Sequence, residues 1–195
     1  PEDFKALVDE CHARGMAVIL DVVYNHAFGQ SPLARMWWDD AAFRPTPDNP
    51  YLNVTARHPF NVGYDFNHES PLTKEFLKVS TQYWLEEFRV DGFRFDLSKG
   101  FTQTDSGDDV GAWNRYDEGR IATLKDYADH IWSVEDGAYM IMEHLSENRE
   151  EKELSEYGQG MYFWSGFNPH DEYLEAAMGY ESNLREVIAD NRGFS

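Results

Sequence analysis

Residues 16–23 read MAVILDVV, an almost unbroken apolar run in which Asp21 is the one charge. A run of this kind, rich in β-branched residues, is typical of a parallel strand that is buried on both faces. Upstream, residues 2–14 carry apolar side chains at helical spacing, and Gly15 follows them. The opening segment therefore predicts an amphipathic helix followed by a buried strand.

The same alternation continues towards the C-terminus. A second helix is expected from the N-cap Ser70 to Phe88, because Pro71 suits the first helical position. Its buried stripe is predicted to comprise Phe76, Val79, Tyr83 and Trp84. Further strands are predicted over residues 90–96, 138–143 and 161–164, and further helices over 121–132, 146–157 and 180–191. This order is the pattern of a parallel sheet covered by helices, an α/β fold.

Residues 24–69 interrupt the alternation. They are rich in Pro, Asn, Gly and aromatic residues, show no sustained period, and are too long for an ordinary connection. We expect them to form a functional excursion or a small inserted subdomain. Residues 1–23 and 70–195 are then left for the main domain.

Two architectures satisfy this alternation, a doubly wound sheet and a (β/α)8 TIM barrel. No glycine-rich phosphate-binding motif follows any predicted strand, which removes the commonest nucleotide-binding folds and favours the barrel. A complete barrel usually needs about 250 residues. The chain has 195 residues and four predicted strands, so we expect a partial barrel that starts and stops inside the fold.

The charge balance restricts the class of partner. Acidic residues outnumber basic ones by 36 to 17, which gives a formal net charge of −19. Such a charge repels phosphate backbones and anionic lipids, so nucleic acid is not an expected partner and a neutral substrate is. No apolar run is long enough to span a membrane, and neither an initiator Met nor a signal peptide is present at Pro1. We expect the true N-terminus to be missing.

Charged residues stand where predicted strands end, which is where barrels carry their functional groups. Arg94 and Asp96 share one strand face, towards the barrel interior. A guanidinium beside a carboxylate holds that carboxylate ionised and oriented, as a nucleophile requires. Glu143 ends the next strand beside the apolar Met142, where we expect desolvation to favour the protonated form of a general acid.

A structural interpretation competes with this catalytic one. Arg94 and Asp96 alone are more often a buried structural ion pair, and a lone Glu such as Glu143 is as often structural as catalytic. Their occurrence together at neighbouring strand ends favours retaining glycoside hydrolysis, in which two carboxyl groups lie about 5 to 5.5 Å apart.

Three segments resemble, in order and spacing, the first three conserved regions of the α-amylase superfamily, glycoside hydrolase family 13. They are DVVYNH at residues 21–26, GFRFD at 92–96 and IMEH at 141–144. The resemblance implies a retaining glycoside hydrolase that acts on α-glucosidic bonds of starch-like glucans through a covalent glycosyl-enzyme. It also implies that the chain covers about strands three to six of the barrel, with residues 24–69 as the insertion called domain B.

The resemblance assigns roles residue by residue. It implies Asp96 as the nucleophile, Glu143 as the acid/base and Arg94 as the residue that orients Asp96. It also implies that His26 contacts the sugar at the cleavage subsite and that Asp21 is structural beneath the site.

Further positions are matched by the same resemblance. Tyr24, which precedes Asn25 as it often does in the family, is grouped with the substrate-binding residues. Lys99 matches a Lys that contacts the leaving-group sugars, although Gly100 stands where many relatives have His. Asn25 matches a ligand of structural calcium in many relatives, and calcium takes oxygen ligands. Calcium is the one cofactor implied.

Aromatic residues in or near the loops are candidate platforms for sugar rings. They are Phe28, Trp37, Trp38, Tyr51, Trp113 and Trp164. For each of them, plain packing is an equally good interpretation. The acidic run over residues 147–156 is predicted to be a solvated helix face.

Alternatives stay open. A transglycosylase, or a branching or debranching enzyme, uses the same covalent intermediate with a different acceptor, and a non-catalytic relative keeps the barrel without the chemistry. The family's fourth region, which supplies a third carboxylate, has no counterpart before Ser195. We therefore expect this polypeptide in isolation to be inactive or poorly folded, because an open sheet exposes its edges. The resemblance favours an extracellular or periplasmic location.

Overall fold

The computed structural model describes residues 1–60, 62–163 and 167–182. Its centre is a four-stranded parallel sheet in the order β1-β6-β7-β8. The strands are β1 (Ile19–Val22), β6 (Gly92–Phe95), β7 (Tyr139–Met142) and β8 (Tyr162–Phe163). Their order in the sheet follows the chain without the reversal of a doubly wound sheet, as in a barrel.

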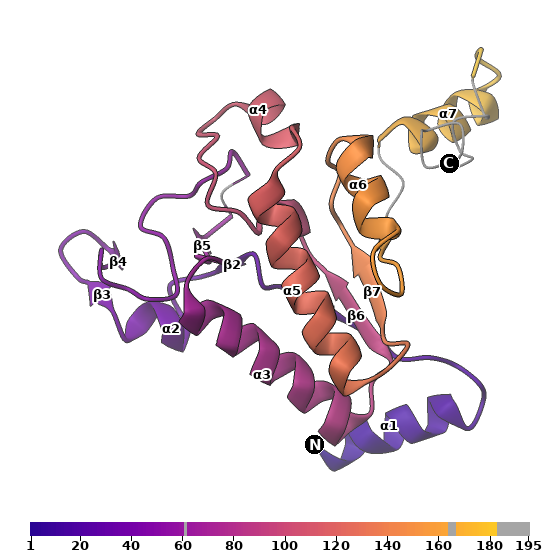
Figure 1. The fold of residues 1–195 in the computed structure, drawn as a ribbon, viewed down its shortest axis with the longest axis horizontal. Helices are drawn as coiled ribbons and strands as arrows, with labels where there is room; N and C mark the ends of the chain where they lie inside the picture. Colours follow the sequence, from indigo (N-terminus) through magenta and orange to yellow (C-terminus); the bar gives the residue numbers. More distant parts are fainter. Residues whose placement is uncertain (61, 164–166, 183–195) are drawn as a thin grey trace.

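Helices cover this sheet. Figure 1 shows α3 (Pro71–Phe88) and α5 (Glu118–Val134) side by side, with α1 (Glu2–His12) beside the C-terminal end of α3 and α6 (Asn148–Ser155) close to β7. The largest buried apolar side chains of the core include Leu77, Phe93, Phe95, Phe101, Leu124, Ile131, Met140 and Met142. Burial of each such side chain stabilises the fold by about 1.5–3 kcal/mol, so the interface between helices and sheet holds the fold together.

The side chains of strand β6 alternate between the two faces of the sheet. Phe93 and Phe95 are buried in the core, whereas Arg94 between them is only partly buried and points to the opposite face, as strand alternation predicts. Gly92 begins the strand because a Cβ there would lie 2.2 Å from the carbonyl oxygen of Tyr139 on β7. The backbones of β6 and β7 therefore approach closely where both strands begin.

Strand β1 differs from its prediction. It was expected to be buried on both faces, but its residues are half-buried and the side chain of Asp21 is 69% exposed. Among the described residues, β1 pairs with β6 alone and forms an edge of the sheet. An edge strand has a neighbour on one side only, so an apolar run does not guarantee full burial.

The buried stripe of α3 also differs from the prediction. The helix begins at Pro71 after the N-cap Ser70, as expected, but Val79 and Tyr83 are more than half exposed. The predicted Phe76 and Trp84 do pack against the core, where they are partly buried. The buried residues of the helix are Thr73, Leu77, Thr81, Leu85 and Phe88. Thr81 tolerates burial because its hydroxyl donates to the carbonyl oxygen of Leu77 at 2.9 Å. The prediction relied on apolar residues alone, so it missed a buried stripe that includes two threonines.

The segment over residues 24–69 is mostly irregular, as expected. Its described regular elements are β2 (His26–Ala27) paired with β5 (Tyr64–Asp65), β3 (Trp38–Asp39) paired with β4 (Arg44–Pro45), and α2 (Pro32–Arg35). A small separate core comprises Ala34, Leu52 and Phe66. The β2–β5 pair returns the chain to the end of β1, which keeps the insertion beside the strand ends. The domain boundaries stay a prediction.

Two short helices lie in the connection between β6 and α5. They are the 3₁₀ helix η1 (Ser98–Gly100) and α4 (Val110–Asn114). Neither was predicted from the sequence, because each is shorter than two helical turns and carries no sustained period.

The C-terminal part contains one helix that was not predicted, α7 (Phe167–Met178). The helix expected over residues 180–191 falls mainly on residues 183–195, which lie outside the described residues, and residues 180–182 are not helical. Trp164 also lies outside the described residues. Within the described part of the chain, no helix combines the length and apolar character needed to cross a membrane.

Candidate active site

Four charged side chains meet where the parallel strands end. Nη1 of Arg94 lies 2.8 Å from Oδ1 of Asp21 on β1 and 2.8 Å from Oδ1 of Asp96, which follows β6. Nη2 of Arg94 lies 2.9 Å from Oε2 of Glu143, which follows β7. One guanidinium therefore bridges three carboxylates from three strands, and the expected contact between Arg94 and Asp96 is present.

Arg94 is the least exposed member of this cluster, with 13% of its side chain accessible. Partial burial lowers the pKa of Arg94, but its hydrogen bonds with Asp21 and Asp96 and the charge of Glu143 raise the pKa above its ordinary value. The guanidinium therefore stays charged at every working pH. A planar cation with several donors holds the carboxylates in defined directions.

The surroundings of Glu143 are not the apolar ones that were predicted. Met142 is fully buried on the opposite face of the sheet and does not cover the carboxylate. Instead, Oε2 of Glu143 accepts a hydrogen bond from the N–H of Leu97 at 3.0 Å and faces Arg94. The prediction was wrong because consecutive side chains of a strand point to opposite faces.

The spacing of Asp96 and Glu143 follows from the strand register. Phe95 pairs with Met142, and the N–H of Glu143 donates to the carbonyl oxygen of Phe95 at 3.1 Å. Asp96 and Glu143 thus follow paired residues on adjacent strands, which lie about 4.8 Å apart. Neighbouring positions on adjacent strands allow two carboxyl groups to approach as closely as retaining glycosidases require, about 5 to 5.5 Å.

His26 lies at the rim of the charged cluster. Burial lowers the pKa of the imidazole, and the negative charge of Asp96 opposes that shift, so a neutral ring stands in the field of Asp96. The ring of Phe28 packs edge-on against His26 with centroids 5.7 Å apart, and Phe28 is 62% exposed. Among the predicted aromatic platforms that the structure describes, Phe28 has the most exposed ring, and this ring packs against His26.

The other predicted platforms are less accessible. Trp113 is buried, and Trp37, Trp38 and Tyr51 are half-buried. Trp113 stacks on the ring of His58 with centroids 4.9 Å apart. Packing accounts for these rings.

Curated relatives resemble parts of the chain. The chloroplastic isoamylase SU1 of Zea mays is 35% identical over 105 residues, which cover 52% of this chain and 13% of the relative. The 1,4-α-glucan branching enzyme GlgB of Aliivibrio fischeri is 30% identical over 150 residues, which cover 73% of this chain and 20% of the relative. The chain thus spans a fifth or less of the length of these relatives. No family model matches the chain.

Solved structures share the fold. Eubacterium rectale Amy13B superposes with a TM-score of 0.69 over 98% of this chain and 41% of its own, at 22% identity. An Anoxybacillus α-amylase superposes with a TM-score of 0.57 over 91% of this chain and 35% of its own, at 23% identity. Fold and sequence relatives agree. The chain belongs to the α-amylase superfamily.

In this α-amylase superfamily chain, Tyr24 lies away from the carboxylates. It is buried in the core, its hydroxyl lies 2.7 Å from Oγ of Ser80 on α3, and its ring packs near Phe95. Burial raises the pKa of this hydroxyl, and the hydrogen bond with Ser80 opposes the shift. The predicted substrate contact is wrong, because the side chain points to the helix layer.

Lys99 is also placed differently from its prediction. It is 5% exposed, and Nζ donates to Oδ1 of Asn114 at 2.6 Å and to the carbonyl oxygen of Leu145 at 2.9 Å. The amine lies 4.1 Å from the ring centroid of Trp113. Burial, together with the charge of Arg120, lowers the pKa of Lys99 to about 8. An amine bound inside the protein contradicts the predicted contact with leaving-group sugars.

Asn25 is fully buried, and its Oδ1 has no hydrogen-bond partner. Oδ1 of Asp65 is a second buried oxygen without a hydrogen-bond partner. The next residue, Phe66, donates its N–H to the carbonyl oxygen of Asn25 at 2.9 Å. A Cβ at Gly100 would lie 1.8 Å from Oδ1 of Asn25, so no side chain fits there. Buried amide and carboxylate oxygens are calcium ligands. Asn25 and Asp65 therefore fit the implied ion, although the described residues contain no cluster of three or more His, Cys, Asp or Glu.

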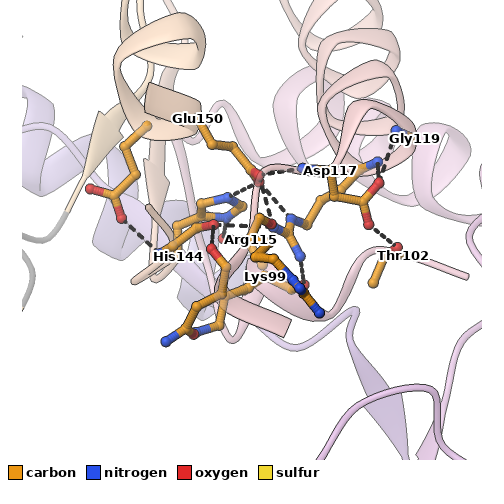
Figure 2. Close-up of polar contacts among 12 residues, drawn as sticks. Lys99, Thr102, Arg115, Asp117, Gly119, His144 and Glu150 are labelled. Atoms are coloured by element: carbon orange, nitrogen blue, oxygen red, sulfur yellow. Dashed lines mark hydrogen bonds and ion pairs between the residues drawn. The ribbon is translucent and has the colours of Figure 1, made fainter. Parts of the chain in front are cut away.

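One charged cluster of the superfamily chain was missed. The acidic run over residues 147–156 was expected to be solvated, but Glu150 is fully buried, where it binds Arg120 and His144 (Figure 2). A signal existed in the sequence. Arg120 stands one residue before the helix predicted over residues 121–132 and four residues before Leu124, in line with its apolar stripe. A buried cation requires a buried partner.

Proposed function

We propose that this chain carries the nucleophile and the acid/base of a retaining enzyme that cleaves α-glucosidic bonds of starch-like glucans. Asp96 is the nucleophile and Glu143 the general acid/base. The observation that carries the proposal is the bridging of both carboxylates by Arg94 at the ends of adjacent strands. The fold alone would not suffice, because one barrel architecture supports many reactions.

The geometry supports a double displacement. Asp96 attacks the anomeric carbon while Glu143 protonates the glycosidic oxygen, so the bond to the leaving group breaks and a glycosyl ester of Asp96 forms. Water then attacks the same carbon, Glu143 takes its proton, and Asp96 leaves as a carboxylate. Arg94 holds Asp96 in place throughout. In this proposal the neutral imidazole of His26, which lies in the field of Asp96, hydrogen-bonds a sugar hydroxyl.

Hydrolysis and transfer differ only in what attacks the intermediate. A sugar hydroxyl in place of water gives transglycosylation, so branching and debranching enzymes use the same first step. The branching enzyme relative and the isoamylase relative match this chain about equally well. The proposal therefore includes both water and a sugar hydroxyl as the acceptor. A non-catalytic relative is disfavoured, because Arg94, Asp96 and Glu143 are present and in contact.

Variants of the natural full-length protein test the proposal on amylose. Glu143→Gln should lower kcat by about 10²- to 10⁴-fold. Asp96→Asn should lower kcat at least as far, because an amide cannot form the ester. Glu86→Gln, on the exposed side of α3, is a matched carboxylate control that should retain activity.

The stereochemistry of the product provides the second readout. Proton NMR of the first product should show the α anomer, because two inversions restore the configuration of the substrate. A β product, or full activity of Asp96→Asn, would refute the proposal. Product analysis on amylose, pullulan and trehalose then separates hydrolysis from transfer and identifies the linkage.

We propose calcium binding at Asn25 separately. Oδ1 of Asn25 and Oδ1 of Asp65 would hold the ion, which would tie the insertion to the strand ends and take no part in the chemistry. Calcium added to the chelator-treated protein should raise Tm by a few degrees, and Asn25→Ala should remove that response. An unchanged Tm of the wild type would contradict calcium binding.

A further inference from the structure

Helix α6 carries a buried carboxylate that the chemistry above does not use. Glu150 and its partners Arg120 and His144 are each at most 1% exposed. They come from α6, α5 and the segment after β7. A buried charge is costly unless it is paired and hydrogen-bonded, so every contact of this carboxylate matters.

Both oxygens of the Glu150 carboxylate are occupied (Figure 2). Oε1 lies 2.5 Å from Nε of Arg120 and 2.7 Å from Nε2 of His144. Oε2 lies 2.8 Å from Nη2 of Arg120 and accepts the N–H of Asp117 at 2.9 Å. Arg120 therefore grips the carboxylate at both oxygens, a geometry that fixes its orientation.

These contacts set the direction of the hydrogen bonds through His144. Burial raises the pKa of Glu150, but His144 and Arg120 outweigh burial and lower the pKa to about 2, so the carboxylate is ionised and only accepts. Burial lowers the pKa of His144, which is therefore neutral. Its Nε2 carries the proton that Glu150 accepts, and its Nδ1 lies 3.0 Å from the hydroxyl of Ser98. That hydroxyl also lies 3.1 Å from the carbonyl oxygen of Glu143, so the two acceptors share its one proton.

Ser98 belongs to the segment that holds Glu143. The N–H of Ser98 donates to the carbonyl oxygen of Glu143 at 3.0 Å, beside the 3.0 Å bond from Leu97 to the Glu143 carboxylate. The carbonyl oxygen of Lys99 accepts from Nη1 of Arg120 at 3.2 Å. Glu150 therefore grips the segment after β6 through Arg120 and the segment after β7 through His144.

We propose that Glu150 is a positioning residue for Glu143. By locking the two segments together, it keeps the N–H of Leu97 and the carboxylate of Glu143 in contact, and so keeps Glu143 where it protonates the leaving oxygen. The inference rests on the proposed acid/base role of Glu143. Its consequence is large, because a displacement of about 1 Å costs about 10²-fold in rate.

Three variants of the natural full-length protein separate positioning from folding. Glu150→Gln keeps the shape but removes the charge that Arg120 needs, so loss of the fold is one of its outcomes. Ser98→Ala removes the hydroxyl that contacts Nδ1 of His144 at 3.0 Å and the carbonyl oxygen of Glu143 at 3.1 Å, and it leaves the buried ion pair intact. Glu153→Gln is the matched control, because Glu153 lies one turn further along α6 and pairs with Lys125 of α5 at 2.7 Å.

The readout is the dependence of the rate on the leaving group. A maltooligosaccharide needs a protonated leaving oxygen, whereas fluoride leaves an α-maltosyl fluoride without that help. For Ser98→Ala we expect kcat/KM on maltopentaose to fall about tenfold, with kcat/KM on the fluoride changed by less than about twofold. The ratio kcat/KM reports formation of the glycosyl-enzyme and excludes its later hydrolysis, in which Glu143 acts as a base for both substrates. Folded Glu150→Gln should show a larger split, of about 10²-fold. Glu153→Gln should show none.

The outcomes are distinguishable. Equal losses on both substrates in Ser98→Ala, or wild-type rates on both, would overturn the positioning role and leave the proposed function standing. A wild-type enzyme that is inert towards both substrates would overturn the proposed function and this inference with it. A split in Ser98→Ala that is absent from Glu153→Gln supports the positioning role.

Discussion

Two arginine-centred clusters in this chain make the same kind of contact in opposite surroundings. Arg94 bridges three carboxylates on the open face of the sheet, where the side chains are 13 to 69% exposed. Arg120 grips Glu150 where neither is more than 1% exposed. The first cluster is able to exchange contacts with a substrate, whereas the second already has its carboxylate oxygens bonded inside the protein. Access to solvent, and not ion pairing, therefore distinguishes the proposed catalytic cluster from the buried one.

Breaking the buried cluster should have the largest effect, and the effect should be on stability. Arg120→Met leaves the carboxylate of Glu150 buried without its main partner. Removing one partner of a buried pair costs about 3–5 kcal/mol in the free energy of unfolding. Urea unfolding of the variant and the wild type measures this loss. A loss below about 1 kcal/mol would mean that the Arg120–Glu150 pair contributes no more to stability than an ordinary surface ion pair.

Breaking the open cluster should act on rate instead. Arg94→Met removes the cation that orients Asp96, and kcat on amylose should fall about 10²- to 10³-fold. The free energy of unfolding should change by less than about 1 kcal/mol, because the partly exposed carboxylates regain water. Arg14→Met is the control, since Arg14 forms an exposed ion pair with Glu10. If Arg94→Met lost stability and kept its rate, the contrast between the clusters would collapse.

Acid should weaken the buried cluster over a defined range of pH. The folded pKa of Glu150 is about 2, below its ordinary value of 4.5, so its ionised form stabilises the fold above pH 4.5. That stabilisation, on the order of 3 kcal/mol, is lost as the pH falls from 4.5 towards 2. Urea unfolding at pH 6 and pH 3 should show a smaller acid loss in a folded Glu150→Gln variant than in the wild type. Equal losses would assign the acid sensitivity to other groups.

The smallest effect is expected from substitution of Tyr24, which tests whether this residue belongs to the core or to the substrate site. Tyr24→Phe deletes the hydroxyl that contacts Ser80 and should reduce the free energy of unfolding by about 0.5–1.5 kcal/mol. KM for amylose should stay unchanged, because the ring lies on the helix side of the sheet. A raised KM with an unchanged free energy of unfolding would show that Tyr24 contacts the substrate.

Much of the proposed catalytic cluster was predictable from local sequence. The alternation of GFRFD places Phe93 and Phe95 in the core and Arg94 on the other face, and this requires nothing beyond the geometry of a strand. Glu143 was likewise expected beside Asp96, and the register of β6 and β7 brings them to adjacent strands. Strand periodicity is local, so these positions needed no knowledge of the rest of the fold.

Positions that depend on packing were predicted less well. Lys99 matches a superfamily position in the sequence, but its amine is bound by Asn114 and Leu145, which lie 15 and 46 residues away. On α3, apolar Val79 and Tyr83 are exposed while Thr81 is buried. Residue type sets a preference for burial or exposure. Whether a residue is in fact buried depends on the side chains that pack against it in the folded chain.

By itself, the sequence determined the α/β order, the strand ends and the carboxylates of Asp96 and Glu143, because each follows from local periodicity and short motifs. Only the tertiary structure decided that Arg94 bridges both carboxylates and that Glu150 is buried within an acidic run. Glu150 and Arg120 are 30 residues apart. The position of Arg120 in line with an apolar stripe signals a buried cation, but its partner comes from elsewhere in the chain and no local pattern identifies that partner.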